Sequence, residues 1–346
     1  MAKIAMIGAG SIVFCKTLLN DLMATPALRG STFALVNRTA PKLERMATFA
    51  RQMVRDNSLD AKITATLDRH EALDGADYVI NMIQVGGLTA AEADYEIPRR
   101  YGVDQCVGDT LAPGGVFRAL RTIPVVLDIA RDMEALCPRA LLLNYANPMA
   151  MVCWALGEQT RLRFLGLCHG VQTTLDLISR YVGVPKNEID YLCAGINHMA
   201  WFLKLEQQGR DLYPTLREKV EKPEYYKAEK VRCEVMRQLG YFMTESTGHL
   251  SEYLPWFRSS TRALETYCDE PEFGGESGAA LRWARLIAQK FPVPDPFLMD
   301  TPALQPRSVE YCSYIIEAME TDRVFRLNGN VRNTGLISNL PDGCCV

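Results

Sequence analysis

The chain has 346 residues, of which 48% are hydrophobic and 23% are charged, and its formal net charge at pH 7 is -3. This length and composition are typical of a globular protein with two domains, or with one domain and a large extension. The charge balance excludes the basic surface that nucleic-acid-binding proteins need. No apolar run approaches the roughly 20 residues that span a bilayer, and no signal peptide precedes the first strand-like run. Eleven scattered cysteines without a CxxC pair indicate reduced thiols in a cytoplasmic protein, not disulfides or a structural zinc site.

The start of the chain has the pattern of a dinucleotide-binding unit. An apolar run at residues 3–8 ends in the turn Gly8-Ala9-Gly10-Ser11, and residues 12–24 continue with helical spacing. Such a turn lets backbone N–H groups at a helix N-terminus approach a pyrophosphate. Val13 replaces the third glycine of the GxGxxG pattern, so a plain strand–helix turn is the alternative. We predict that Gly8, Gly10 and Ser11 contact the cofactor.

A second unit follows, with a strand at residues 32–36 and a helix at about 41–56. The end of this strand normally carries an acidic residue that binds the ribose 2′-hydroxyl of NAD. Here the position holds Asn37, followed by Arg38. The missing carboxylate leaves NADP as an alternative to NAD, and Arg38 either meets a 2′-phosphate or is a solvated loop residue. We assign both residues to the cofactor site.

Three more apolar runs indicate buried strands, at residues 76–83, 140–145 and 163–168. The first ends at Gln84, which we also assign to the cofactor, and a pair of glycines behind it allows either close backbone approach to a ligand or a simple turn. Residues 104–118 form a polar, glycine-rich loop that leads into a helix ending near Leu136.

Asn147 and Pro148 follow the strand at 140–145. A proline in this place fits a helix start, which Asn147 can cap. An amide at a strand tip is equally well placed to bind a sugar hydroxyl.

Strands alternate with helices as far as the run at 191–194, which predicts a Rossmann-like, doubly wound and mostly parallel sheet in a dinucleotide-binding domain of residues 1–195. From residue 201 the alternation stops. A polar hairpin at 203–209 and charged helices at about 214–239 follow. Residues 196–346 are therefore predicted to form an α+β substrate and catalytic domain.

Cys168 and His198 are the candidate metal ligands, each placed at the end of an apolar run. Adjacent residues of an extended chain point in opposite directions, so only one of Cys168 and His169 can bind an ion together with His198. A thiolate with an imidazole suits Mn, Fe, Co, Ni or Zn. Two protein ligands would leave open positions for substrate oxygens. The alternative is a buried thiol beside two hydrogen-bonded histidines.

Six segments together resemble glycoside hydrolase family 4, most closely its bacterial α-galactosidase branch. They are Gly8-Ala-Gly-Ser11, Asn144-Tyr-Ala-Asn-Pro-Met149, Gly166-Leu-Cys-His169, Ala194-Gly-Ile-Asn-His-Met199, Gly240-Tyr-Phe-Met-Thr-Glu-Ser246 and Gly329-Asn-Val-Arg-Asn-Thr-Gly-Leu-Ile337. The resemblance covers nearly the whole chain and is weakest at about 257–310. It implies an α-galactosidase that uses NAD and Mn²⁺, or another divalent transition metal, and forms a homodimer or homotetramer.

The resemblance also implies a redox-assisted mechanism, outside the usual two-carboxylate scheme of glycosidases. NAD⁺ takes a hydride from sugar C3, and the ketone acidifies the proton at C2. A base removes that proton while the metal stabilises the enediolate. The C1–O bond breaks by elimination, water adds, and the hydride returns.

By the same resemblance, Cys168 and His198 are the metal ligands, Asn147 binds substrate and His169 is the proton donor. An imidazole with an ordinary pKa near 6.5 suits proton exchange at neutral pH. Phospho-glycosidase branches carry Asp or Asn after the cysteine, so a 6-phosphosugar is not expected. For the base, relatives use an Asp or Tyr from the second domain. The segment 244–253 lacks that Asp, which leaves His249, Tyr241 and Tyr253 as candidates.

Two features depart from the family pattern. Asn37 and Arg38 stand where close relatives tend to have an acidic residue. Family members also continue past Val346, so we expect a C-terminally truncated sequence with exposed apolar surface and weakened folding and dimer formation.

Other functions compete with this interpretation. One is a 2-hydroxyacid dehydrogenase of the lactate or malate type, which would need an arginine for the substrate carboxylate and an Asp-paired histidine. Another is an inactive NAD-binding module left by truncation. Within the glycosidase hypothesis, an α-galacturonide or an α-glucoside are alternative substrates.

Overall fold

The computed structural model describes residues 1–11, 14–290 and 303–346. Its larger sheet has six strands in the order β3-β2-β1-β4-β5-β6, and every neighbouring pair is parallel. The strands are β1 (Lys3–Ile7), β2 (Thr32–Val36), β3 (Lys62–Thr66), β4 (Tyr78–Asn81), β5 (Leu141–Asn144) and β6 (Arg163–Gly166). Because the strand order reverses between β1 and β4, the crevice at their carboxyl ends is where such sheets bind ligands.

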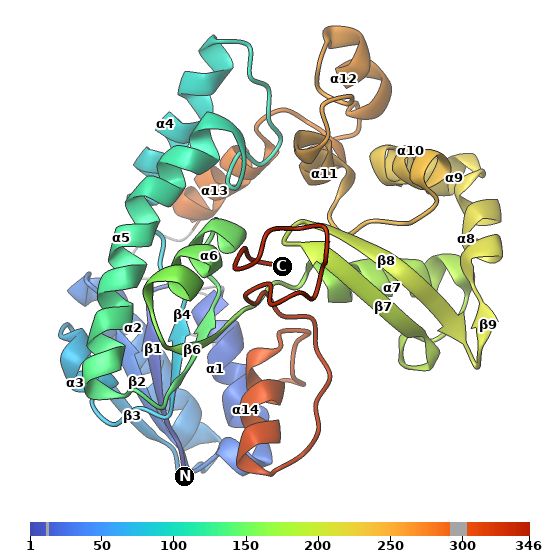
Figure 1. Ribbon diagram of the computed structural model, residues 1–346. Coiled ribbons are helices and arrows are strands. Elements are labelled where there is room, and N and C mark those ends of the chain that lie inside the picture. Colours follow the sequence, from blue (N-terminus) through green and yellow to red (C-terminus); the bar gives the residue numbers. More distant parts are fainter. Residues whose placement is uncertain (12–13, 291–302) are drawn as a thin grey trace.

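Alternation of side chains along each strand divides the core into two layers. In β1, Ile4 and Met6 pack into one layer, and Ala5 and Ile7 into the other. The first layer contains helices α1 (Phe14–Ala24), α2 (Ala40–Asp56) and α14 (Cys312–Glu320), and the second contains α3 (Arg69–Leu73), α5 (Ala112–Leu136) and α6 (Met149–Gln159). Helices therefore cover both faces of the parallel sheet (Figure 1), as in a doubly wound fold.

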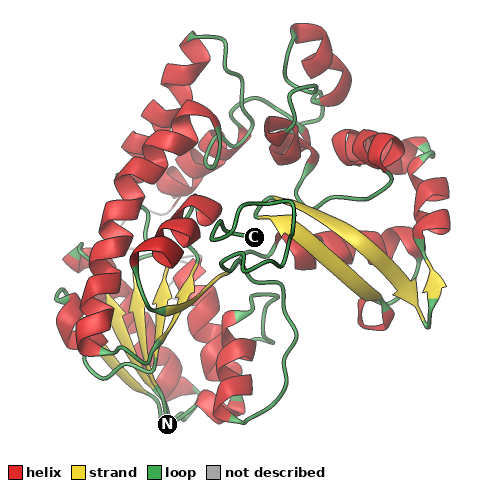
Figure 2. Cartoon of the chain, viewed as in Figure 1, coloured by secondary structure: helices red, strands yellow, loops and turns green. Residues whose placement is uncertain are grey.

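The smaller sheet is antiparallel and contains β7 (Asp190–Ile196), β8 (Met199–Gln207) and β9 (Arg210–Asp211). Figure 2 shows it as a long hairpin separate from the parallel strands. Its apolar face packs on α7 (Gly170–Val182), α8 (Tyr213–Val220) and α10 (Lys230–Leu239). The other helices are α4 (Gly87–Arg100), α9 (Pro223–Tyr226), α11 (Thr247–Tyr253), α12 (Thr261–Tyr267) and α13 (Ala279–Lys290). Among the described residues, no helix has the length and apolar character needed to cross a membrane.

The predicted fold class is confirmed, with two corrections to individual elements. The run at 191–194 lies in β7 of the antiparallel sheet and not in the parallel one. The predicted loop at 104–118 ends early, because α5 begins at Ala112 and includes Gly114 and Gly115 in its first turns. Residues 12 and 13, predicted to start the first helix, lie outside the described residues.

The division into domains at residues 195 and 196 stays a prediction. The hairpin strand β7 starts before that boundary. The helix α14 lies far beyond it in the sequence, yet Cys312, Ile315 and Ile316 pack in the same core as β1 and α1. Late residues of the chain thus complete the first core.

Candidate active site

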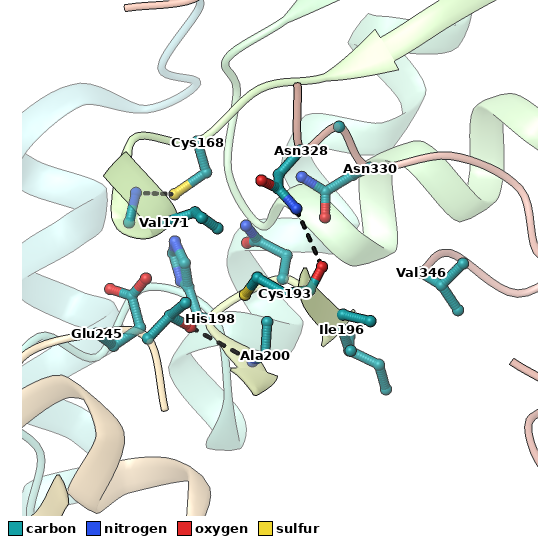
Figure 3. Close-up of a pocket in the computed structure, with 16 residues that line it drawn as sticks. Cys168, Val171, Cys193, Ile196, His198, Ala200, Glu245, Asn328, Asn330 and Val346 are labelled. Carbon is teal, nitrogen blue, oxygen red and sulfur yellow. Dashed lines mark hydrogen bonds between the residues drawn. The ribbon is translucent and has the colours of Figure 1, made fainter. Parts of the chain in front are cut away.

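The candidate active site is a pocket between the carboxyl end of β6 and the β7–β8 hairpin, with a cavity volume of about 90 Å³. Figure 3 shows Cys168, His198 and Glu245 gathered at one end of this pocket, with Asn328 and Asn330 on another side. Of these five residues, the sequence predicted two as ligands.

Cys168 occupies the connection between β6 and α7. It is the only one of the eleven cysteines that is not buried, and all eleven are free thiols. The backbone N–H of Gly170, in the first turn of α7, donates to Cys168 Sγ at 3.4 Å. A helix N-terminus favours negative charge, and the thiolate is the form of cysteine that binds metals.

His198 lies at the tip of the β7–β8 hairpin, in a left-handed backbone conformation with φ of +62°. Glu245 approaches it because the preceding segment runs antiparallel to β8, with Phe202 N–H donating to Phe242 O and Thr244 N–H donating to Ala200 O, both at 2.9 Å. Glu245 is also left-handed, with φ of +74°. Strained backbone of this kind concentrates at functional sites, where the surrounding structure holds it in place.

The ligand atoms of Cys168, His198 and Glu245 all lie within 4.8 Å of one another. A thiolate, an imidazole and a carboxylate together suit a divalent transition metal. The charges around His198 are also compatible with a bound cation. Burial alone would lower the pKa of His198, but the charges of Glu245 and Cys168 raise it. The pocket therefore favours positive charge beside this imidazole, which a proton or a metal cation can supply.

A second group shares His198 and contains Asp109 and His249. His249 Nε2 lies 2.9 Å from His198 Nδ1, and His249 Nδ1 lies 3.3 Å from Glu252 Oε2. Burial would lower the pKa of His249, but the Glu252 hydrogen bond and the Asp109 and Glu252 charges raise it to about 9. Burial would likewise raise the pKa of Asp109, and His249, Arg118 and His198 outweigh this and lower it.

The predicted acid and base candidates occupy different environments. His169 is more than half exposed, and its Nδ1 lies 3.1 Å from Glu310 Oε1. This hydrogen bond, opposed by burial, raises the pKa of His169. Tyr253 OH lies 3.2 Å from His198 Nδ1. Tyr241 is 42% exposed and packs its ring on Tyr213, with ring centroids 5.9 Å apart. Neither Tyr241 nor His249 is among the described residues that line the pocket.

Asn147 does not cap the following helix. Pro148 is the N-cap residue of α6 and makes no side-chain cap. Asn147 Nδ2 instead donates to Asp109 Oδ2 at 3.2 Å, and Asp109 Oδ1 lies 3.8 Å from His249 Nε2. The Asn147 amide is thus connected to His249 through Asp109.

The predicted cofactor residues surround the carboxyl ends of β1 and β2. Gly8 has a φ of +95°, and a β-carbon there would lie 2.9 Å from the Met82 carbonyl. A β-carbon on Gly10 would lie 1.9 Å from Asn37 Nδ2. Both glycines thus allow a close approach that other residues would block. Two other residues of the set, Arg38 and Gln84, are exposed, and Ser11 Oγ accepts from Phe14 N–H at 3.1 Å.

Comparison with known proteins identifies the family. A model of family 4 glycosyl hydrolases matches residues 3–184, and one of the C-terminal domain of this family matches residues 193–346. The chain belongs to glycosyl hydrolase family 4. It is therefore a glycosidase, and the dehydrogenase alternative falls away.

Within family 4, the chain is similar to two α-galactosidases and shares its fold with a solved 6-phospho-α-glucosidase. The chain is 42% identical to an α-galactosidase of Rhizobium meliloti strain 1021, over 98% of this chain and 71% of that protein. It is 40% identical to an α-galactosidase of Bacillus subtilis strain 168, over 100% of this chain and 80% of that protein. The fold is shared with a 6-phospho-α-glucosidase from gut microorganisms, solved in complex with NAD and Mn²⁺, at a TM-score of 0.76 and 20% identity over 99% of this chain and 80% of the other.

Sequence reasoning missed three residues of this family 4 site. Glu245 lines the pocket, Glu252 is buried against His249, and Asn197 lines the pocket with its Oδ1 unpartnered among the described residues. A signal for Glu245 was present, because it is the acidic residue one methylene longer than the expected Asp, in the expected segment. Nothing local distinguished Glu252 from a surface acid of a short helix.

Proposed function

We propose that the protein is an NAD- and divalent-metal-dependent α-galactosidase. The observation that carries this proposal is the group of Cys168, His198 and Glu245 at the pocket, beside the carboxyl edge of a dinucleotide-type sheet. The identity to two α-galactosidases over nearly the whole chain supports the substrate. The shared fold with a protein solved with NAD and Mn²⁺ supports the cofactors.

Cys168 and His198 would hold the metal, and the glycine turn at residues 8–11 would approach the NAD pyrophosphate. When bound, NAD⁺ supplies transient oxidation at sugar C3 and the metal supplies Lewis acidity at the neighbouring oxygens. Asn37 and Arg38 lie at the end of β2, where the adenosine ribose of a dinucleotide is bound in this fold, and Gln84 follows β4. NADP stays an alternative to NAD.

Glu245 is the base that the site geometry favours. Its carboxylate lies in the pocket within 4.8 Å of the ligand atoms of Cys168 and His198. A carboxylate there can accept the proton from sugar C2. His249 has both ring nitrogens engaged, by His198 and Glu252, and Tyr241 packs on Tyr213. These two predicted candidates are less suited to reach the sugar.

His169 is the proposed proton donor to the leaving oxygen. It follows Cys168 directly, and its ring is accessible to an aglycone while Glu310 holds Nδ1. Asn147 binds substrate through its amide. Asn197 Oδ1, which has no partner in the described part of the chain, can accept from a sugar hydroxyl. A buried acceptor without a partner is unfavourable, so a hydroxyl here would be bound strongly.

A neutral sugar suits this pocket better than a uronide. No lysine or arginine occurs among the described residues that line it, and Glu245 adds negative charge. A uronate carboxylate would meet no lysine or arginine among these residues and would lose its hydration. This observation favours the α-galactoside over the α-galacturonide.

The proposal includes a cytoplasmic homodimer or homotetramer. Eleven free thiols, including the proposed ligand Cys168, suit a reducing compartment. Exposed apolar side chains on α5, at Val116, Phe117 and Leu120, offer surface for association. Light scattering of the purified protein measures the assembly.

The deciding experiment is hydrolysis of p-nitrophenyl α-galactoside by chelated, cofactor-stripped protein, with NAD⁺, Mn²⁺ and a thiol reductant each omitted in turn. We expect activity only with all three. The matching α-glucoside and α-galacturonide should be hydrolysed poorly. Activity that ignores all three additions contradicts the mechanism, and cofactor binding without turnover under any metal supports the inactive module instead.

A further inference from the structure

His198 is contacted on its Nδ1 side by side chains that do not line the pocket. His249 Nε2 lies 2.9 Å from Nδ1, Tyr253 OH lies 3.2 Å away and Thr110 Oγ1 lies 3.4 Å away. This crowding leaves Nε2 as the nitrogen that can serve the Cys168 and Glu245 side. The contacts behind the ring therefore determine how the ring is oriented and which nitrogen faces the metal side.

Glu252 ends this chain of contacts and is firmly anchored. Its side chain is 2% exposed. One carboxylate oxygen accepts from the backbone N–H of Val107, and both oxygens lie 3.3 Å from the backbone N–H of Gly108. Oε2 also faces His249 Nδ1 at 3.3 Å. A buried carboxylate with this many backbone donors is fixed in position, and as an ion it can only accept hydrogen bonds.

The direction of the hydrogen bond between His249 and Glu252 follows from that anchor. Since Glu252 accepts, His249 Nδ1 carries the proton and donates. His249 Nε2 and His198 Nδ1 then share one proton across their 2.9 Å contact, whichever ring holds it. His198 Nε2 is thus the nitrogen that can exchange its own proton for a metal cation on the Cys168 side.

We propose that Glu252 and His249 are positioning residues that engage Nδ1 of His198 and so fix the orientation in which its Nε2 can bind a metal. The inference rests on the proposed function, because it assumes a metal held by Cys168 and His198. Partners on the second nitrogen of a metal-bound histidine typically change metal affinity about 10–100-fold. Here the partner is a second histidine, and a carboxylate stands behind it.

Glu252 also connects the metal ligand to a loop. Val107 and Gly108 lead directly into Asp109 and Thr110, which themselves face the histidine pair. Anchoring this loop to α11 therefore places two more polar groups beside His198. A purely structural role for Glu252 would be to hold the helix α11 and the loop together. The experiment has to separate this role from the orientation of His198.

Arg258 provides the matched control. Its guanidinium binds the Asp104 carboxylate, Ser251 Oγ at 3.0 Å and Gly275 O at 2.9 Å. It thus ties the same helix to the same loop region without contacting either histidine in any described hydrogen bond. Arg258→Lys loosens this connection, whereas Glu252→Gln leaves it intact and replaces one acceptor oxygen by a donor.

The test measures Co²⁺ affinity and the visible absorption of the Co²⁺-loaded protein, with Cys168→Ser as the blank for the thiolate band. We expect Glu252→Gln to weaken Co²⁺ binding about 10–100-fold and to shift the absorption, Glu252→Asp to recover part of the affinity, and Arg258→Lys to match the wild type. His249→Asn, which keeps the Glu252 anchor, should weaken binding as much as Glu252→Gln and serves if that variant does not fold.

Two outcomes would overturn the inference alone: wild-type affinity and spectrum in Glu252→Gln or His249→Asn, or equal weakening in Arg258→Lys. A wild-type protein without any Cys168-dependent Co²⁺ absorption would overturn the metal site itself, and the inference with it. The two failures are thus distinguishable.

Discussion

Glu245 occupies a position that its own backbone disfavours. Its φ of +74° lies in the left-handed region, which costs a residue with a β-carbon on the order of 1–2 kcal/mol. The pairing of Phe242 and Thr244 with β8 holds it there. This carboxylate lies beside a thiol and an imidazole despite the conformational cost of its backbone. A role in the reaction explains this better than a contribution to stability.

Glu245→Gln therefore tests the base directly. The amide keeps the size and the backbone but cannot accept a proton from carbon, so kcat should fall about 10²–10⁴-fold. Co²⁺ affinity should change much less, because Cys168 and His198 remain. Steady-state kinetics and a Co²⁺ titration on the same preparation separate the two effects. A large loss of affinity with normal kcat at saturating metal would make Glu245 a third ligand and not the base.

Asn37 is the residue at which we expect the preference between NAD and NADP to be set. Its Oδ1 accepts from Thr39 N–H at 3.0 Å, a contact that an aspartate can keep. Asn37→Asp should therefore fold normally, bind the ribose 2′-hydroxyl of NAD and repel the 2′-phosphate of NADP. Charged hydrogen bonds of about 1.5–3 kcal/mol predict a shift of at least about tenfold in the NAD to NADP affinity ratio. Fluorescence titration with both cofactors measures it, and an unchanged ratio would remove Asn37 from the site.

Among the elements, the strands could be predicted from the sequence, but the sheet that β7 joins could not. β1, β2 and β4 are apolar runs bounded by turns, and a parallel sheet buries such runs on both faces. β7 is equally apolar, but no local feature says which sheet it joins. The start of α5 was missed because Pro113-Gly114-Gly115 is a loop signal. In the structure, β-carbons on Gly114 and Gly115 would lie 2.4 Å from Asp94 O and 2.3 Å from the Thr110 carbonyl carbon, so these glycines serve close packing within a helix.

The site residues, too, could be predicted only where a local sequence pattern marks them. Cys168 and His198 were found because each ends an apolar run with a reactive side chain. Glu245 and Glu252 depend on tertiary contacts with β8 and with the loop at Val107, which one sequence does not encode locally. Their assignment needed the fold.

The first turn of α7 provides an element-level test. A β-carbon on Gly170 would lie 2.2 Å from Glu245 Oε1, so Gly170→Ala should push the carboxylate out of place while leaving the helix intact. Displacement by about 1 Å can reduce the rate on the order of 100-fold. Gly157→Ala in α6 is the matched control, since its nearest neighbour, Phe164 Cζ, lies at an ordinary 3.6 Å. Equal activity of the two variants in the galactosidase assay would contradict the proposed placement of Glu245.

At the scale of the whole molecule, the proposed metal binds residues from both sheets, which pack in different apolar cores. Cys168 follows the last strand of the parallel sheet, and His198 belongs to the hairpin of the antiparallel sheet. The parallel sheet packs in two apolar clusters of its own, and the hairpin packs in a third. A cation bound by both residues would connect the two sheets.

Metal removal should therefore lower the unfolding temperature. A ligand at 100 times its Kd stabilises the native state by about 2.7 kcal/mol, which for a chain of this size is a shift of several degrees. Thermal unfolding with and without saturating Mn²⁺ measures this increment. Cys168→Ser should abolish it, while Cys15→Ser, at a buried thiol in the first core, should lower the base stability and keep the increment. An increment that survives in Cys168→Ser would mean that Mn²⁺ stabilises the protein elsewhere, and that the connection between the two sheets does not run through Cys168.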